Sequence, residues 1–161
     1  MKPAELIFVR KGMEYTDPDI REITEEDEML IKELCEDSRE NDTEMGKIFA
    51  NVHYNRDDYE SLFGVFHDGK LVGLVEAVQY EDTDFIDICS MFVHKNYRNR
   101  GFESRLVKAV LDLYPEKNYQ YRTSEQDTHD SAALARSLDF KFVTELTNND
   151  DIFQKIKEVM K

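Results

Sequence analysis

The stretch Val93-His-Lys-Asn-Tyr-Arg-Asn-Arg-Gly-Phe-Glu-Ser-Arg-Leu106 carries the most informative pattern of the chain. It predicts the end of a strand, a short basic loop, a glycine and the first turns of an amphipathic helix. The first turn of a helix leaves backbone N–H groups unpaired, and the helix dipole adds positive potential there. Anions such as phosphate are stabilised at such a junction. Gly101 allows close approach to the backbone, and the arginines add forked donors for phosphate.

The charge of this stretch differs in sign from that of the chain as a whole. The formal net charge is −14, yet between Lys95 and Lys108 there are five bases and one acid, Glu103. A basic cluster in an acidic chain predicts a site for a small polyanion. The overall charge argues against nucleic acid and anionic membranes as partners.

Length and composition indicate one globular domain. The 161 residues, 40% of them hydrophobic, are enough to bury a sizeable core. No apolar run is long enough to span a membrane, and the run Leu6–Val9 is too short for a signal peptide, so we expect a cytoplasmic protein. Cys35 and Cys89 are expected as free thiols. The histidines are scattered and predict no metal site.

Apolar periodicity and turn signals predict an α+β domain that spans residues 1–161. From Ile20 the expected order is β-α-α-β-β-β-α-β-α-β-β, around a mostly antiparallel sheet flanked by helices. Residues 1–18 are expected to form an extension with one short strand, 5–10. The segment 152–159 is expected to be a strand, with a helix as the alternative. The other expected strands begin at residue 20 and cover 59–66, 71–80, 84–93, 119–123 and 140–146; the expected helices cover 24–37, 43–52, 101–114 and 128–138.

Local signals support three of these elements. Thr24 and Asp27 resemble a capping box at the start of the first helix. The pair Asp68-Gly69 between two apolar runs is typical of a tight hairpin, because both turn residues need positive φ. In the second helix an apolar stripe recurs at helical spacing and is expected to be core: Met45, Ile48, Phe49 and Val52.

The opening stretch also resembles the acetyl-CoA-binding segment of the GNAT superfamily of N-acetyltransferases. Arg98-Asn-Arg-Gly101-Phe-Glu103 fits the family's Arg/Gln-x-x-Gly-x-Gly/Ala loop, and Val93 and Tyr97 stand where the family commonly has Val and Tyr. The resemblance covers residues 20–147. Three further segments resemble the family's opening strand and helix, its hairpin and the end of its last helix: Ile20–Asp27, Phe66–Gly73 and Leu138–Phe140.

The resemblance implies acetyl-CoA as co-substrate and a primary amine as acceptor, with direct attack of the amine on the thioester in a ternary complex. A bulge in the family's third strand usually makes room for the pantetheine arm, and the apolar phase slips by one residue near Cys89–Ser90. The residues expected to bind acetyl-CoA are Met91, Phe92, Val93, Arg98, Asn99, Arg100, Gly101, Phe102, Glu103 and Ser104.

The chain departs from the family pattern at several positions. Glu103 replaces Gly or Ala in the loop and either repels a pyrophosphate or points aside to pair with nearby arginines. Ala135 stands where many members have a Tyr that protonates the leaving thiolate, and Thr128 stands where many have Asn. Asp139 replaces a Gly, which is a mild change because Asp tolerates the left-handed conformation.

These departures leave the catalytic groups open. The candidates are Asp87, Ser90, Tyr121 and Glu125, with Tyr97 as another candidate acid; ordinary solvated positions are the competing interpretation for the polar ones. His94 and His129 are expected to be surface or cap residues. The acidic residues 37–44 and 57–60 are expected to form a solvated face, or to favour a cationic amine.

Three functional hypotheses follow. The first is the N-acetyltransferase, for which a homodimer is one assembly considered. The second is a GNAT-fold binding or regulatory module that has lost catalysis, motivated by Glu103 and Ala135. The third is an unrelated α+β domain.

Overall fold

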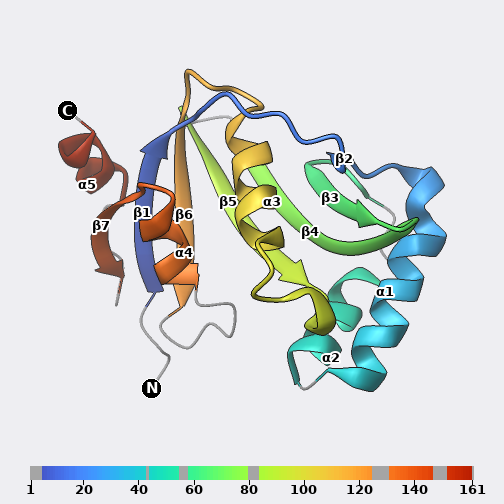
Figure 1. Ribbon diagram of the computed structural model, residues 1–161. Coiled ribbons are helices and arrows are strands. Elements are labelled where there is room, and N and C mark those ends of the chain that lie inside the picture. Colours follow the sequence, from blue (N-terminus) through green and yellow to red (C-terminus); the bar gives the residue numbers. More distant parts are fainter. Residues whose placement is uncertain are drawn as a thin grey trace. The chain divides into compact units, whose positions relative to one another are not determined.

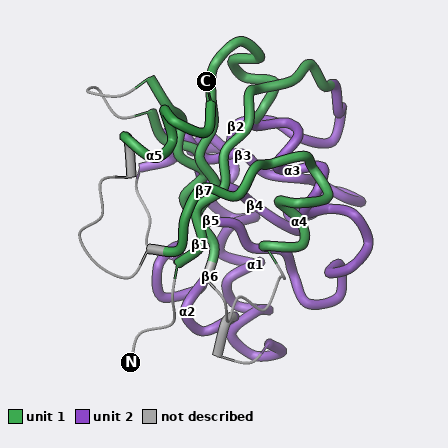
Figure 2. Tube along the Cα trace, turned by 90° about the vertical axis from the view of Figure 1, so that its left-hand side faces the viewer, with its two compact units in different colours: residues 1–15, 77–89, 111–161 green, residues 16–76, 90–110 purple. Residues whose placement is uncertain are grey.

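The computed structural model describes residues 5–42, 44–54, 58–79, 84–124, 131–146 and 152–160. The chain forms two compact units, shown in different colours in Figure 2. Unit 1 comprises residues 1–15, 77–89 and 111–161, and unit 2 comprises residues 16–76 and 90–110. The strands β4 (Lys70–Gln79) and β5 (Phe85–Val93) and the helix α3 (Phe102–Leu111) contribute residues to both units.

Unit 2 contains the N-terminal helices and most of the hairpin strands (Figure 1). Strand β3 (Leu62–His67) pairs antiparallel with β2 (Ile20–Glu22) on one side and with β4 on the other. The elements are β2 (Ile20–Glu22), the 3-10 helix η1 (Glu25–Asp27), α1 (Glu28–Asn41), α2 (Glu44–His53), β3 (Leu62–His67), most of β4 (Lys70–Gln79), the end of β5 (Phe85–Val93), the 3-10 helix η2 (Lys95–Tyr97) and most of α3 (Phe102–Leu111).

The core of unit 2 lies between the helix pair α1–α2 and the strands β3, β4 and β5. Phe49 of α2 stacks on Phe92 of β5 with ring centroids 4.0 Å apart. The expected stripe of α2 is only partly buried, because Ile48 and Val52 are more than half exposed while Phe49 is buried. Other buried members of this core include Ile23, Ile31, Leu34, Cys35, Leu62, Leu71 and Leu74.

Two local predictions in unit 2 are confirmed. The backbone N–H of Thr24 donates to the Asp27 carboxylate at 2.9 Å, as a capping box requires, although a turn of 3-10 helix precedes α1. At the hairpin between β3 and β4, Asp68 and Gly69 have φ of 51° and 77°. These left-handed values match the turn type that the Asp-Gly pair predicts.

Unit 1 is built around the N-terminal strand. Strand β1 (Glu5–Lys11) pairs antiparallel with both β6 (Asn118–Ser124) and β7 (Lys141–Leu146), and the first residues of β5 pair parallel with β6. The expected short strand is therefore present, but it is an interior strand and not part of an extension. The elements of unit 1 are β1 (Glu5–Lys11), the start of β5, β6 (Asn118–Ser124), α4 (Ser131–Ser137), β7 (Lys141–Leu146) and α5 (Ile152–Val159).

The segment 152–159 is a helix, so the expectation of a final strand was wrong. Ile156 is fully buried and packs with Val9 and Phe85 in the core of unit 1. Val159 and Met160 follow at helical spacing and pack on the same cluster. This i, i+3, i+4 pattern favours one apolar helix face over the alternation of a strand.

The hydrogen-bonded order of the strands is β2-β3-β4-β5-β6-β1-β7. The β5–β6 pair is parallel, whereas β1–β6, β1–β7, β2–β3 and β3–β4 are antiparallel. Together with the flanking helices, this confirms the predicted α+β class. Within the described residues, no helix combines the length and the apolar character that crossing a membrane demands.

Candidate functional site

The connection from β5 to α3 lies in unit 2. A backbone hydrogen bond and two left-handed residues fix its conformation. The N–H of His94 donates to the Val72 carbonyl at 2.8 Å, which fixes the start of the connection to β4. Asn99 and Gly101 have φ of 60° and 88°. A Cβ on Gly101 would meet no described atom within 4 Å, so this glycine serves backbone conformation and leaves the loop surface open.

Helix α3 begins directly after this turn. The first intrahelical bond that reaches back to the loop runs from the Arg105 N–H to the Gly101 carbonyl at 3.1 Å. The N–H groups of Phe102, Glu103 and Ser104 precede it and have no acceptor within the helix. With the helix dipole, they form a site suited to an anion.

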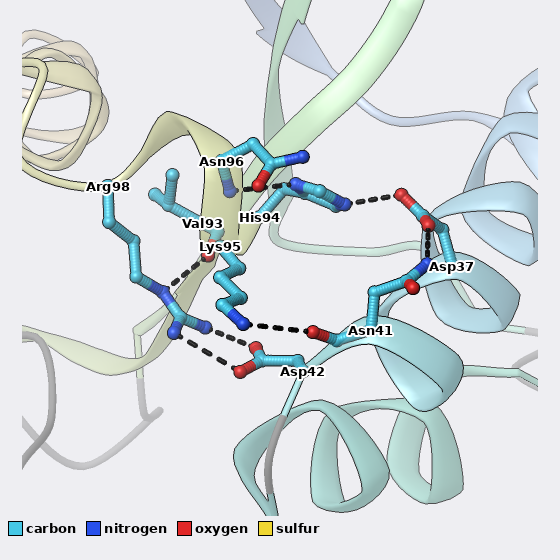
Figure 3. A network of polar contacts seen from close by, with 8 residues as sticks. All are labelled: Asp37, Asn41, Asp42, Val93, His94, Lys95, Asn96 and Arg98. Carbon is cyan, nitrogen blue, oxygen red and sulfur yellow. Dashed lines mark hydrogen bonds and ion pairs between the residues drawn. The ribbon is translucent and has the colours of Figure 1, made fainter.

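Arg98 does not project freely from the loop. Its guanidinium pairs with Asp42 at 2.6 Å, and its Nε donates to the Val93 carbonyl at 2.9 Å (Figure 3). The side chain of Arg98 is 17% exposed and that of Asp42 is 3% exposed, so this is a nearly buried ion pair. The guanidinium also lies 5.3 Å from the ring centroid of Phe92. Its charge is thus engaged with the C-terminal end of α1.

The two neighbouring arginines differ from each other. Arg105 is held by Asp17 at 2.7 Å and by Asp19 at 2.8 Å, and these carboxylates raise the pKa of the guanidinium. Arg100 is exposed, lies over the Tyr97 ring at 5.1 Å and donates to the Asn96 carbonyl at 3.3 Å. Among the described residues no salt bridge involves Arg100, which leaves it the accessible guanidinium of the loop.

Glu103 is buried, with only 8% of its surface exposed. Its side chain is therefore packed against protein atoms and does not extend into solvent in front of the helix. This agrees better with the interpretation that the carboxylate points aside than with one in which it fills ligand space. Phe102 beside it is also buried and meets the Tyr97 ring edge-on at 5.7 Å.

Strand β5 loses its alternation at the expected position. Cys89 and Ser90 are both exposed in succession, and the register with β6 runs from Phe85 to Ile88. Such a slip is what a bulge produces. The side chains of Phe92 and Val93 are buried, so these residues offer a ligand their backbone and not their side chains.

Asp87 and Tyr121 lie in unit 1 on opposite faces of the β5–β6 pair. Asp87 is registered with Gln120, whereas Tyr121 is registered with Ile88. Because successive strand residues point to opposite faces, the two side chains diverge. They cannot act side by side as the base and acid of one reaction.

Asp87 is the candidate whose environment is most perturbed. Burial raises the pKa of its carboxyl group, although Arg122 partly offsets this. Its Oδ1 is buried without a hydrogen-bond partner, while Oδ2 accepts from the Cys89 thiol at 3.6 Å. A desolvated carboxylate of this kind is a better base than an exposed one.

The other candidates are less favourably placed. Tyr121 is buried, with its ring 5.7 Å from that of Phe140. Ser90 is exposed on β5, and Glu125, Thr128 and His129 lie outside the described residues.

Position 135 is part of the core. Ala135 is fully buried, and its carbonyl accepts from the N–H groups of Leu138 and Phe140. Asp139 has φ of 64°, so the expected left-handed residue after α4 is confirmed.

Sequence reasoning missed a polar network between α1 and the loop (Figure 3). His94 was expected to be a surface or cap residue; it is buried, and its Nδ1 caps η2 by accepting from the Asn96 N–H at 3.1 Å. Its Nε2 contacts Asp37. Lys95 donates to the Asn41 carbonyl at 3.3 Å. The side chain of Asp42, which was expected on a solvated face, is almost fully buried.

The family assignment comes from comparison with known proteins. The model of the acetyltransferase (GNAT) family matches residues 19–140, which is most of the chain. The chain belongs to the GNAT family. The part of the chain matched by the family model includes the β5–α3 connection and the catalytic candidates of β5 and β6. A search of curated proteins found no match.

Solved GNAT structures share the fold at low sequence identity. A putative GNAT acetyltransferase from Novosphingobium aromaticivorans has a TM-score of 0.63 and 18% identity, over 88% of this chain and 60% of that one. A GNAT acetyltransferase from Colwellia psychrerythraea has a TM-score of 0.65 and 14% identity, over 89% of this chain and 54% of that one. The aminoglycoside N-acetyltransferase AAC(6′)-Iy, solved in complex with CoA, has a TM-score of 0.55 and 19% identity, over 83% of this chain and 98% of that one.

The chain spans 50–60% of the length of the first solved structures it matches. At these identities the likeness concerns the fold.

Proposed function

We propose that this GNAT domain is an N-acetyltransferase that transfers the acetyl group of acetyl-CoA to a primary amine. The observation that carries the proposal is the N-terminus of α3, where the first N–H groups of the helix follow the left-handed Gly101 and Arg100 stands exposed beside them. This arrangement suits a pyrophosphate, which CoA carries. A cytoplasmic location fits the two free cysteines and belongs to the same proposal.

The loop residues have separate tasks in this proposal. The N–H groups of Phe102, Glu103 and Ser104, together with Arg100, hold the pyrophosphate. Arg98 is a positioning residue, because Asp42 and the Val93 carbonyl occupy its donors. The exposed step Cys89–Ser90 leaves backbone groups of Met91–Val93 to contact the pantetheine arm and to polarise the thioester carbonyl.

The chemical step is direct attack. The amine nitrogen forms a bond to the thioester carbon, the C–S bond breaks, and the electron pair leaves with sulfur as the thiolate of CoA. The amine proton needs a base, and Asp87 is the proposed one because its carboxylate is desolvated. Ser90 and Glu125 are further candidates for the base. Tyr97 is the candidate acid for the thiolate when Asp87 is the base. Tyr121 is a candidate acid only with another base, because its side chain points to the opposite face of the β5–β6 pair from Asp87.

Calorimetric titration with acetyl-CoA tests the binding step. Arg100→Ala should weaken binding about tenfold, because a charge-assisted contact to phosphate is lost. Arg39→Ala is the matched control, since Arg39 is also exposed and lies over a tyrosine ring, that of Tyr54, at 5.2 Å. Absence of binding at millimolar acetyl-CoA, or equal effects of the two variants, would contradict the proposal.

A second candidate function is a GNAT-fold module without catalysis. It is favoured by the fully buried Ala135, which leaves no hydroxyl at the position of the family's acid. A screen of primary amines, with release of the CoA thiol as readout, separates the two functions. Thiol release that depends on Arg100 supports the enzyme. Acetyl-CoA binding only in a Glu103→Gly variant supports the module.

A further inference from the structure

The segment 12–19 connects β1 to β2 and is anchored to α3 and to the residue that follows this helix. The Met13 N–H donates to the Leu111 carbonyl at 3.2 Å, and the Tyr15 N–H donates to the Asp112 carboxylate at 3.0 Å. The match to the family model begins only at residue 19. The segment is thus an addition to the part of the chain that the family model matches.

In unit 2 this segment ends in two carboxylates that bind the same guanidinium. Arg105 donates from Nε to one oxygen of Asp17 at 2.7 Å and from Nη2 to the other at 2.8 Å. The same Nη2 donates to Asp19 at 2.8 Å. The Asp17 side chain is 5% exposed and the Asp19 side chain is 53% exposed. Because the pair with Asp17 is bidentate and nearly buried, Arg105 is firmly held by the segment.

The charges of this Asp17–Asp19–Arg105 cluster do not cancel. At neutral pH the two carboxylates contribute two negative charges, and the guanidinium contributes one positive charge. One negative charge is therefore in excess. It is best accessible at Asp19, since this is the exposed carboxylate of the two.

The cluster lies next to the proposed pyrophosphate site. Arg105 directly follows Ser104 in α3, and its own N–H donates to the Gly101 carbonyl at 3.1 Å. Its guanidinium lies 5.2 Å from the ring centroid of Phe102, and that of Arg100 lies 5.9 Å from the same centroid. Charges at such a spacing are only partly screened, because the Debye length is about 10 Å at 0.1 M salt. The excess negative charge therefore acts on the same space as Arg100.

We propose that Asp17 and Asp19 lower the affinity of the acetyl-CoA site by placing one uncompensated negative charge beside Arg100. Arg105 is a positioning residue in this arrangement. It fixes the segment and offsets one of the two carboxylates, and it does not contact the phosphates. The CoA product carries the same pyrophosphate as acetyl-CoA, so the same charge favours release of the product. The proposal rests on the acetyl-CoA site proposed above and gives the segment 12–19 a role in it.

The first test removes the exposed carboxylate. Acetyl-CoA and CoA are titrated calorimetrically into the full chain and into Asp19→Asn, at 50 mM and at 500 mM KCl. We expect Asp19→Asn to bind both ligands about threefold more tightly at 50 mM KCl, because a like charge near the pyrophosphate is lost. The gain should disappear at 500 mM KCl, where salt screens the charge.

The matched control is Glu28→Gln. The Glu28 side chain is 54% exposed and paired with a base, Lys32, at 3.3 Å, so it resembles Asp19 in exposure and pairing. It belongs to α1, and its removal changes the net charge of the chain by the same amount. We expect its affinity for both ligands to equal that of the wild type.

The second test separates an arginine that offsets carboxylates from one that binds phosphate. Arg105→Met should weaken acetyl-CoA binding about fivefold, because both carboxylates then lack their base. The triple variant Asp17→Asn, Asp19→Asn and Arg105→Met should bind at least as tightly as the wild type. A triple variant that stays as weak as Arg105→Met would show a direct phosphate contact and overturn the proposal. Far-UV circular dichroism checks the fold of these variants, and Asp19→Asn decides the question if they unfold.

The outcomes distinguish this proposal from the proposed function. A wild type that binds acetyl-CoA, with no gain in Asp19→Asn, an equal gain in Glu28→Gln, or a gain that persists at 500 mM KCl, would overturn the role of the segment alone. A wild type that does not bind acetyl-CoA at millimolar concentration would overturn the proposed function and this role together.

Discussion

Two residues apart in the loop, Arg98 and Arg100 have different surroundings. Arg98 is nearly buried against Asp42, whereas Arg100 is exposed over the Tyr97 ring. Removing one partner of a buried ion pair leaves the other charge uncompensated. At the residue scale, Arg98 is held by an ion pair and Arg100 is accessible, which fits the separate roles proposed for them.

We expect Asp42→Asn and Arg98→Met each to lower the free energy of unfolding by about 3 kcal/mol, measured by urea denaturation. Arg100→Ala should change it by less than about 0.5 kcal/mol, because it is a surface substitution. A double variant, Asp42→Leu with Arg98→Met, should cost less than the two single changes together. Wild-type stability in Asp42→Asn would show that the pair contributes nothing to holding the loop.

Asp87 gives a prediction with a defined pH dependence. Its pKa is raised by burial, so the ionised form is disfavoured in the folded chain and its cost appears as pH rises through the folded pKa. Asp87→Asn should therefore raise the melting temperature at pH 7, and this difference should shrink as pH falls toward 4. The same variant should slow acetyl transfer if Asp87 is the base. Asp84→Asn, an exposed change on the segment just before β5, is the control.

At the residue scale, the sequence predicted local backbone conformation better than it predicted side-chain contacts between distant residues. Gly101, the left-handed Asp139 and the slip at Cys89–Ser90 could be predicted because each depends on local backbone geometry. The pairing of Arg98 with Asp42 could not, because the two residues are 56 positions apart. In the sequence, the acidic residues 37–44 have the pattern of a solvated helix face. Only the tertiary fold places Arg98 against Asp42.

At the scale of elements, β1 is an interior strand whose side chains are buried on both faces. Ile7, Phe8 and Val9 are all fully buried, and the strand has hydrogen-bonded neighbours on both sides. Such continuous burial produces an apolar run and not an alternating one. The run Leu6–Val9 was visible in the sequence, but its partners are far along the chain.

Truncating Phe8 to Ala should lower the free energy of unfolding by about 3–5 kcal/mol, because the ring is completely buried. Phe142→Ala is the matched control. Phe142 meets Phe8 edge-on at 5.6 Å but is half exposed, so its loss should cost clearly less. Chemical denaturation followed by far-UV circular dichroism measures both, and equal costs would contradict the interior placement of β1.

Periodicity predicted most elements close to their observed bounds, and it failed where a segment is short. The segment 152–159 is short, and the expectation of a strand overlooked that Ile156 and Val159 recur at helical spacing, which places both on the face that packs on Val9. Helix α3, by contrast, has a long apolar face and ends before Pro115 as expected.

At the scale of the whole molecule, the two cysteines differ in burial, so their reaction with a thiol reagent distinguishes the native chain from one in which unit 2 has opened. Cys89 is exposed, while Cys35 lies in the core of unit 2, where burial raises the pKa of its thiol to about 11. At pH 8 we expect one thiol per chain to react rapidly with a maleimide. The second should react only as unit 2 opens, at a rate that rises with urea. Two rapid thiols in native buffer, counted by mass spectrometry, would contradict this burial.

The position of β1 has a consequence for synthesis on the ribosome. Leu6 is registered with Thr123 on one side and with Glu145 on the other, so β1 is synthesised more than 100 residues before either of its partner positions. Pairings of such long sequence separation form slowly. Until they form, β1 in the nascent chain is an apolar strand with two unpaired edges, the type of segment that chaperones hold and that aggregates when left uncovered.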